Sequence, residues 1–246
     1  MAIGDFSAQA EAYARARPGY PAGFVRELAL TAGVRAGDAV ADVGAGTGIF
    51  AGILAELGFA VTAIEPNAAM RTLAPAISGL TTCAGTFEAT GLADASQRWV
   101  TAAQAFHWAD PPRALPEMRR VLAPGGALTV LWNDRENERS PALAFVAAAI
   151  RRAVPEWDEA YRGADWSALL RSTGDFARVV TAECSHVVTM SRARFLDLWR
   201  SHNRLMEAAG SELLAELQAE IEDFLDDERL AAVDVPYVCR AWTATS

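Results

Sequence analysis

The sequence contains few of the residues that usually bind metals, form disulfides or enter membranes. Its three cysteines, Cys83, Cys184 and Cys239, have neither paired nor metal-type spacing, which is typical of reduced thiols in a cytosolic protein. No apolar run approaches the roughly 18 residues of a membrane span. The N-terminus carries Asp5 and Glu11 and lacks an apolar h-region, so we expect no signal peptide and a cytoplasmic location.

Clusters of basic residues are also absent. The formal net charge of the 246 residues is −9, whereas a nucleic-acid-binding protein normally presents a basic face. The basic groups at 15–17 and 119–120 are too short to form one, which argues against a nucleic-acid substrate. What the chain does contain is 52% hydrophobic and 22% charged residues, an ordinary soluble composition that can bury a large core.

Short β-rich runs alternate with helical runs, which predicts a mostly parallel α/β sheet. The expected strands are 39–43, 59–64, 80–83, 99–104, 127–132, 176–189 and 235–243. Later helices are expected near 141–154, 191–205 and 211–227, as a cap on the sheet. The helix around Met118 is expected to begin near Pro116 and not at Asp110, because an interior proline loses a hydrogen bond and clashes.

The stretch DVGAGTGIF at residues 42–50 has the composition of a ligand loop, because its glycines let a backbone approach a ligand closely. A dinucleotide, a triphosphate and a cofactor with an amino-acid group are the alternatives. A Walker-type loop needs a lysine, and none is near Gly48. A dinucleotide loop needs its third glycine at the position of Ile49. Glu65 closes the next strand, where a carboxylate could accept from a ribose in either a dinucleotide or an S-adenosylmethionine site.

Five motifs occur in a fixed order along the chain. They are YARARPGYP (13–21), DVGAGTG (42–48), VTAIEPNAAM (61–70), AQAFHWAD (103–110) and RVLAPGGALTVLWN (120–133). In this combination the sequence resembles the class I S-adenosylmethionine-dependent methyltransferases, and within them the small-molecule branch that includes trans-aconitate methyltransferase-like proteins. The resemblance implies a Rossmann-like, seven-stranded, mostly parallel sheet with an antiparallel last strand and a helical cap.

The resemblance covers most of the chain, which we expect to form a single methyltransferase domain over residues 1–246. Residues 1–20 would be a lid segment, 21–133 the cofactor-binding half, and 134–246 the remaining strands with the cap helices. One position departs from the pattern, since Arg98 stands where similar sequences usually carry an acidic residue. We expect this change to affect local packing and not activity.

The resemblance also implies positions for the cofactor, S-adenosylmethionine. The methionine moiety would pass along the glycine loop, Glu65 would hold the ribose hydroxyls, and the adenine would lie between residues 66–70 and 86–87. The end of the fourth strand would lie near the sulfonium. The full implied set is Gly44, Ala45, Gly46, Gly48, Glu65, Pro66, Met70, Thr86, Phe87, Ala103 and Gln104.

Five further residues are candidates for the acceptor side or the lid. His107 follows the fourth strand, where it would act as a general base or a hydrogen-bond donor to the substrate, or else fix its loop through a backbone carbonyl. Trp108 would contact the acceptor or be core, and His202 would line the entrance. Arg17 and Tyr20 lie on the lid segment, which in similar enzymes folds over the cofactor, so both are candidate cofactor-binding residues. Arg17 would pair with the methionine carboxylate or be solvated.

The charged segment NDRENERS at 133–140 follows the fifth strand. Arg135 and Arg139 are expected to be solvated there, with contact to an acidic substrate as the alternative.

Methyl transfer from a sulfonium is an in-line displacement with a neutral leaving group, so it depends mainly on holding the acceptor near the methyl group and needs no metal. We therefore expect a methyltransferase that acts on a small molecule, at a carboxylate or hydroxyl oxygen, without a membrane partner. The alternatives are a nicotinamide-dependent oxidoreductase and a non-catalytic module that binds S-adenosylmethionine. The sequence predicts neither the acceptor's identity nor the oligomeric state.

Overall fold

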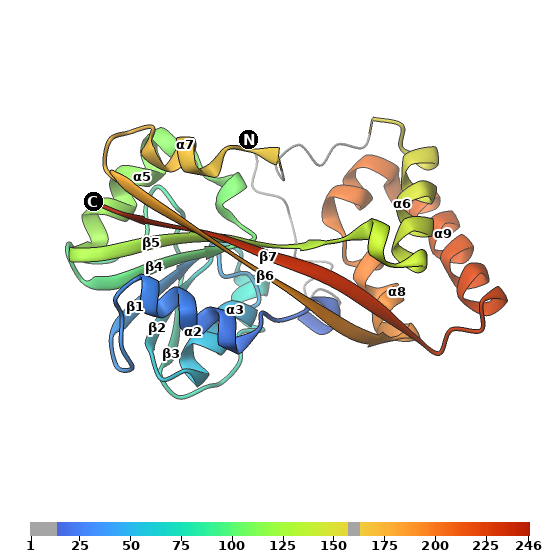
Figure 1. Ribbon diagram of the computed structural model, residues 1–246, viewed down its shortest axis with the longest axis horizontal. Coiled ribbons are helices and arrows are strands. Elements are labelled where there is room, and N and C mark those ends of the chain that lie inside the picture. The colour runs from blue at the N-terminus through green and yellow to red at the C-terminus, as the bar shows by residue number, and fades with distance from the viewer. Residues whose placement is uncertain (1–13, 157–162) are drawn as a thin grey trace.

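A seven-stranded sheet forms the centre of the protein in a computed structural model that describes residues 14–156 and 163–246 (Figure 1). The strand order is β3-β2-β1-β4-β5-β7-β6. The strands are β1 (Ala39–Val43), β2 (Ala60–Ile64), β3 (Leu80–Cys83), β4 (Gln97–Ala103), β5 (Leu122–Arg135), β6 (Arg178–Ser191) and β7 (Ala232–Thr245).

The directions of the strands match the predicted fold class. β1 pairs in parallel with β2 and β4, β2 with β3, and β4 with β5. β7 runs antiparallel to both of its neighbours, β5 and β6. Every strand except β7 therefore runs in one direction. The prediction of a Rossmann-like, mostly parallel sheet with an antiparallel last strand is confirmed.

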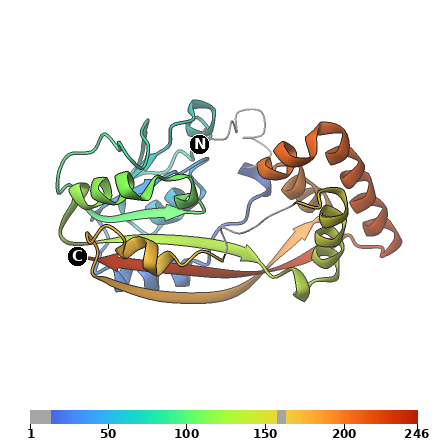
Figure 2. The same ribbon diagram turned by 90° about the horizontal axis from the view of Figure 1, so that it is seen from above.

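Helices cover both faces of the sheet and also form a group beyond one end of it (Figures 1 and 2). They are α2 (Ala22–Thr31), α3 (Ile49–Glu56), α4 (Ala68–Arg71), η2 (Phe106–Trp108), α5 (Pro111–Val121), η3 (Asn137–Arg139), α6 (Pro141–Ala153), α7 (Trp166–Arg171), α8 (Arg192–Arg200) and α9 (Asn203–Asp227). Side chains alternate along each strand, so Val40 packs in the cluster that contains α2 and α3, and Ala41 in the cluster that contains α5 and α7. Two apolar cores thus lie on opposite faces of one sheet.

The group beyond the sheet consists of α6, α8 and α9, which we call the cap. Its helices share a third apolar core, in which the rings of Phe145 and Phe224 stack with centroids 4.1 Å apart. β5, β6 and β7 have 14 residues each, whereas β1 has five. The surplus length of these three strands reaches past the central sheet to the cap (Figure 2).

The cap helices form where they are expected, but two bounds differ from the prediction: α8 ends at Arg200 and not at 205, and α9 begins at Asn203 and not at 211. The Ser191 side chain caps α8 by accepting a hydrogen bond from the backbone N–H of Arg194. α9 is interrupted at Gly210 (φ 75°, ψ 173°), next to the helix expected from 211. The predicted start of α5 near Pro116 is wrong, because this helix begins at Pro111 and includes Pro116. Its buried apolar stripe outweighs the one hydrogen bond that an interior proline removes.

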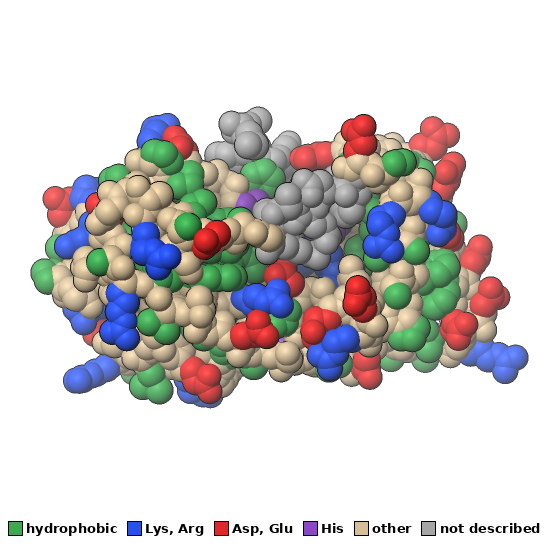
Figure 3. Space-filling model, turned by 45° about the horizontal axis from the view of Figure 1, so that its top comes forward, with side chains coloured by type: hydrophobic (Ala, Val, Ile, Leu, Met, Phe, Trp, Pro, Cys, Tyr) green, Lys and Arg blue, Asp and Glu red, His purple; other side chains and the backbone are tan. Residues whose placement is uncertain are grey.

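Charged side chains are spread over the surface of the molecule. Figure 3 shows acidic and basic side chains interspersed over one face, with acidic ones frequent at the end formed by the cap. Within the described ranges, no helix is both long and apolar enough to cross a lipid bilayer.

Candidate functional site

A cavity of about 670 Å³ lies at the carboxyl ends of the central strands, where open parallel sheets bind their ligands. Its volume falls in the range of about 300–1,000 Å³ that is typical of small-molecule sites. Gly48 is the only residue of the predicted site that does not line this cavity. The predicted residues that do line it are Arg17, Tyr20, Gly44, Ala45, Gly46, Glu65, Pro66, Met70, Thr86, Phe87, Ala103, Gln104, His107, Trp108 and His202.

The glycines of the loop between β1 and α3 adopt left-handed backbone conformations, with φ of 70° at Gly44, 56° at Gly46 and 77° at Gly48. A Cβ atom on Gly44 would lie 2.6 Å from the Cβ of Ala105, so the loop can approach the wall after β4 only with glycine there. A Cβ on Gly48 would lie 3.0 Å from the Cδ of Pro75. Gly48 therefore serves the turn into α3, while the preceding loop lines the cavity.

Glu65 follows β2 and is held in place by backbone N–H groups. Its Oε2 accepts from the N–H of Gly46 at 2.9 Å, and its Oε1 accepts from the N–H of Asn67 at 2.9 Å. Asn67 in turn caps α4 by accepting from the N–H of Met70 at 3.1 Å. The carboxylate and the Met70 side chain are thereby fixed at the same side of the cavity.

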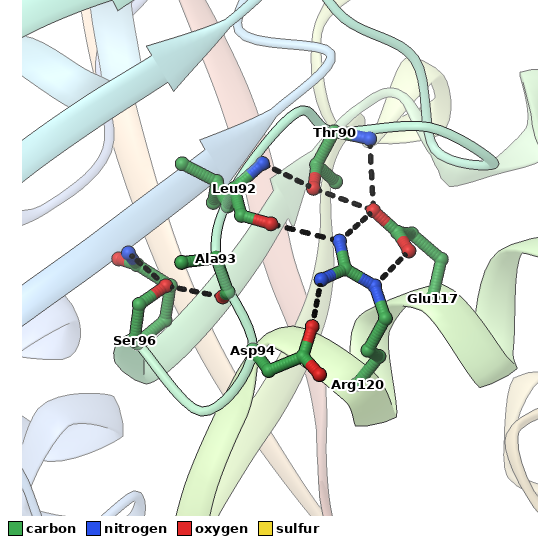
Figure 4. A network of polar contacts seen from close by, with 8 residues as sticks. Thr90, Leu92, Ala93, Asp94, Ser96, Glu117 and Arg120 are labelled. Atoms are coloured by element: carbon green, nitrogen blue, oxygen red, sulfur yellow. Dashed lines mark hydrogen bonds and ion pairs between the residues drawn. The ribbon is translucent and has the colours of Figure 1, made fainter.

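The loop after β3 reaches the cavity through residues 86–87 and is anchored to α5 by Glu117 (Figure 4). Oε1 of Glu117 accepts from the N–H of Thr90 at 2.9 Å and from its Oγ1 at 2.6 Å. Arg120 donates to the same carboxylate, and its Nη1 lies 2.5 Å from Oδ1 of Asp94. Hydrogen bonding from Arg120, supplemented by Thr90, lowers the pKa of Glu117 to about 2. This charged network holds the loop in the position that the cavity requires.

Asp42, the first residue of the glycine motif, is a cavity residue that the sequence interpretation did not assign to the site. Its side chain is buried, and its Oδ1 accepts from the Oγ1 of Thr101 at 2.8 Å. Burial raises the pKa of Asp42 from 3.8 to about 7, and the nearby Glu65 carboxylate adds to the increase. The sequence signal for this residue is the aspartate that opens the D-x-G-x-G-x-G pattern at 42–48.

The raised pKa of Asp42 makes stability depend on pH. The carboxyl group loses its proton above about pH 4 in the unfolded chain but only above about pH 7 in the folded protein, so the free energy of unfolding falls across this window as pH rises. Between pH 5 and pH 7, the ionisation of Asp42 is expected to lower the free energy of unfolding by roughly 2 kcal/mol. Urea unfolding of Asp42→Asn should therefore show a smaller decrease between these pH values. An unchanged pH dependence in the variant would contradict the assignment.

The end of β4 turns sharply into the short helix η2. Gln104 has a left-handed backbone (φ 58°), which is uncommon outside glycine, and its Nε2 donates to the backbone oxygen of Asn133 at 2.8 Å. The turn places His107 and Trp108 on the cavity wall with ring centroids 4.9 Å apart. Phe106 is instead buried in the core.

The described part of the N-terminal segment connects the cap to the glycine-loop helix. Arg194 of α8 donates to the backbone oxygen of Arg17 at 3.2 Å. Tyr20 packs edge-on against Phe50 of α3, with ring centroids 4.9 Å apart. These contacts hold Arg17 and Tyr20 at the cavity. The remainder of the predicted lid, residues 1–13, lies outside the described residues.

Three cavity residues that were not assigned from sequence come from the long strands, namely Asn133 and Arg135 of β5 and Tyr237 of β7. The expectation that Arg135 is solvated is wrong. Arg135 is only 9% exposed, and its guanidinium carbon lies 4.6 Å from the ring centroid of Trp199 in α8. Arg139 is exposed, as expected.

Two other residues named from the sequence differ in their position relative to the cavity, since His202 lines it and Arg98 does not. His202 is buried at the start of α9, where its ring lies parallel to that of Trp199 with centroids 6.3 Å apart. Arg98 lies at the beginning of β4 and donates to the backbone oxygen of Pro124 at 2.9 Å. Its atypical charge therefore contacts a turn at the end of the strand opposite the cavity.

Sequence comparisons find methyltransferases. Residues 41–130 match a family model described as a methyltransferase domain. An uncharacterised methyltransferase of Mycobacterium tuberculosis is 42% identical over 132 residues, which cover 53% of this chain and 53% of that protein. An uncharacterised methyltransferase-like protein of Schizosaccharomyces pombe is 29% identical over 73% of each chain. The chain thus spans about half the length of the mycobacterial relatives it matches.

Solved methyltransferase structures share the fold. A candidate type II methyltransferase from Anaeromyxobacter dehalogenans superposes with a TM-score of 0.65 at 23% identity, covering 92% of this chain and 97% of that one. Phosphoethanolamine N-methyltransferase 2 of Haemonchus contortus, solved with phosphomonomethylethanolamine and S-adenosylhomocysteine, superposes with a TM-score of 0.54 at 16% identity. It covers all of this chain, which spans 60% of that one.

Residues 41–130 are thus similar to a methyltransferase domain, the relatives above carry methyltransferase names, and the solved structures share the fold. They do not confirm the trans-aconitate methyltransferase-like branch.

Proposed function

We propose that the protein transfers a methyl group from S-adenosylmethionine to a small-molecule acceptor. The observation that carries this proposal is the hydrogen bond of 2.9 Å between the N–H of Gly46 and the carboxylate of Glu65 at the cavity. It brings together a backbone that a ligand can approach closely and an acceptor for a ribose diol. The methyltransferase matches support the same conclusion.

The lining residues fit the parts of the cofactor in order across the sheet. The methionine group would lie along Gly44 and its neighbours, and the ribose against Glu65. Met70 and Phe87 are both buried apolar residues and would enclose the adenine, with Pro66 and Thr86 beside them. Ala103 and Gln104 at the end of β4 would face the sulfonium. An apolar slot with a few convergent polar groups is what a small-molecule site requires.

Catalysis would depend mainly on position. S-adenosylmethionine supplies an electrophilic methyl group on a sulfonium whose leaving group is neutral. The chain therefore has to hold the acceptor atom in line with that methyl group at about 3–3.5 Å. Tyr20 and Trp108 present aromatic rings at the cavity, where a ring face favours a cation.

An oxygen nucleophile, as a carboxylate or a hydroxyl, is the acceptor we propose. A carboxylate is already ionised at neutral pH and needs no base, whereas a hydroxyl must lose a proton. His107 lies on the cavity wall at the end of β4 and would hydrogen-bond the acceptor. We assign the enzyme to a reducing compartment such as the cytoplasm, since Cys83, Cys184 and Cys239 are free thiols.

His107→Ala should lower kcat/KM by about tenfold, the value of one hydrogen bond, while the Kd for S-adenosylhomocysteine stays unchanged. His107→Gln should recover most of the loss if His107 acts by hydrogen bonding, and little if it acts as a base. Steady-state kinetics measures the change in kcat/KM, and calorimetry measures the Kd for S-adenosylhomocysteine. Full turnover by His107→Ala would eliminate both roles.

The proposed function is tested by measuring S-adenosylhomocysteine release against small acids, phenols and amines. We expect release with an acid or a hydroxyl compound. Release with amines only would contradict the assignment to oxygen. Cofactor binding without release from any acceptor would favour a non-catalytic module, and NAD binding in place of S-adenosylmethionine would favour an oxidoreductase.

A further inference from the structure

β5 continues beyond the point where the cofactor's reactive end would lie. The last residue of β4, Ala103, pairs with Leu131 of β5, but β5 runs on to Arg135. Asn133 and Arg135 are two positions apart on one strand, so their side chains share a face, and both line the cavity. β5 is two strands away from β1, which corresponds to roughly 10 Å across the sheet. This extension therefore lies on the acceptor side of the cavity.

Acidic residues predominate on one side of the cavity and basic residues on the other. The acidic residues that line the described cavity belong to β1, to the end of β2, and to the loops next to η2; they are Asp42, Glu65, Glu88 and Asp110. Arg113 of α5 also lines that side, close enough to Glu88 to lower the pKa of its carboxyl group. On the side of β5, the lining cations are Arg135 and Arg17. Tyr237 of β7 is the direct strand partner of Arg135. Burial raises the pKa of Tyr237, and the nearby positive charges of Arg135 and Arg17 counteract this increase.

The surroundings of Arg135 suit an anion. Its guanidinium carbon lies over the ring of Trp199 of α8, 4.6 Å from the centroid. The N–H donors of a guanidinium lie in its plane, in a fork that matches a carboxylate or a phosphate. Arg135 also hydrogen-bonds Tyr237, and both side chains line the cavity. A positive charge held on a buried wall attracts an anion more strongly than one in water does.

We propose that Arg135 binds an anionic oxygen group of the methyl acceptor, with Arg17 and Tyr237 beside it, and so selects acceptors that carry a carboxylate or a phosphate. This inference rests on the proposed methyltransferase function and deepens it. It makes the β5–β7 extension the element that determines acceptor specificity.

The experiment titrates the protein, saturated with S-adenosylhomocysteine, with three probes of similar size: benzoate, phenyl phosphate and uncharged benzamide. We expect at least one anion to bind at least tenfold more tightly than benzamide, and the better anion identifies the group. Arg135→Gln should abolish this preference without changing the Kd for S-adenosylhomocysteine. Arg135→Lys, which keeps the charge and loses the bidentate fork, should retain part of it.

Arg139→Gln is the matched control, since Arg139 is an exposed arginine of the same segment, and it should bind all three probes as the unmodified protein does. Equal binding of the anions and benzamide, no binding of either anion, or an anion preference that survives in Arg135→Gln would overturn the inference. Failure of S-adenosylhomocysteine to bind would instead overturn the proposed function, so the two failures are distinguishable.

Discussion

Gly44→Ala is expected to lower the free energy of unfolding by about 3 kcal/mol. An alanine in the left-handed conformation that Gly44 adopts (φ 70°) costs about 1 kcal/mol. Its Cβ would also lie 2.6 Å from the Cβ of Ala105 and 3.0 Å from the Cζ of Phe87, which is overpacking worth about 1–3 kcal/mol. Both neighbours are buried, so the strain cannot be relieved by a shift into solvent.

Gly46→Ala is the matched control for this prediction. Gly46 also has a positive φ (56°), but no atom lies within 4 Å of the position its Cβ would take. Urea unfolding should therefore show only the backbone cost, about 1 kcal/mol. The difference between the two variants isolates the contact of the glycine loop with the wall after β4. Equal losses of stability would show that this close approach is not real.

Glu65→Ala is expected to raise the Kd for S-adenosylhomocysteine about 100-fold, or about 2.7 kcal/mol. Hydrogen bonds to a charged group contribute about 1.5–3 kcal/mol each, and the ribose diol would lose its acceptor. The variant also releases the N–H groups of Gly46 and Asn67, which hold the loop in place. Glu65→Gln keeps the shape and loses the charge, so its Kd for S-adenosylhomocysteine should lie between those of the unmodified protein and Glu65→Ala. Titration calorimetry measures all three proteins.

Glu88→Gln provides the comparison at another acidic wall residue. Glu88 lines the same cavity, but its Oε1 accepts from the N–H of Asp110 at 2.9 Å, and no part of the cofactor is assigned to it. The Kd of the Glu88→Gln variant for S-adenosylhomocysteine should therefore change by less than about threefold, a difference under 1 kcal/mol. A Glu65→Ala variant that binds S-adenosylhomocysteine as tightly as Glu88→Gln would remove the ribose from its proposed place.

The wall of the cavity that the glycine loop and Glu65 form could be predicted from the sequence because its signals are local. The glycines of 44–48 are consecutive in one turn, and Glu65 ends the neighbouring strand, so a short pattern records their geometry. Topology then brings them together, since the carboxyl ends of β1 and β2 are adjacent in a parallel pair. The same logic placed Gln104 and His107 after β4.

The wall of the cavity that β5 and β7 form could not be predicted in the same way. Arg135 meets Tyr237 only because β5 and β7 pair antiparallel in a register that joins residues far apart in the sequence. A charged segment such as NDRENERS is typical of a solvated loop, and only the extension of β5 buries its third residue against Trp199. Pro116 illustrates a related limit, because the packing of α5 on the sheet overrides local propensity.

The central claim is that the glycine loop and Glu65 bind S-adenosylmethionine, and ligand-dependent urea unfolding tests it most directly. S-adenosylmethionine at one hundred times its Kd should raise the free energy of unfolding by about 2.7 kcal/mol, and NAD at the same concentration should leave it unchanged. Stabilisation by NAD, or no stabilisation by S-adenosylmethionine at any concentration, would contradict the account.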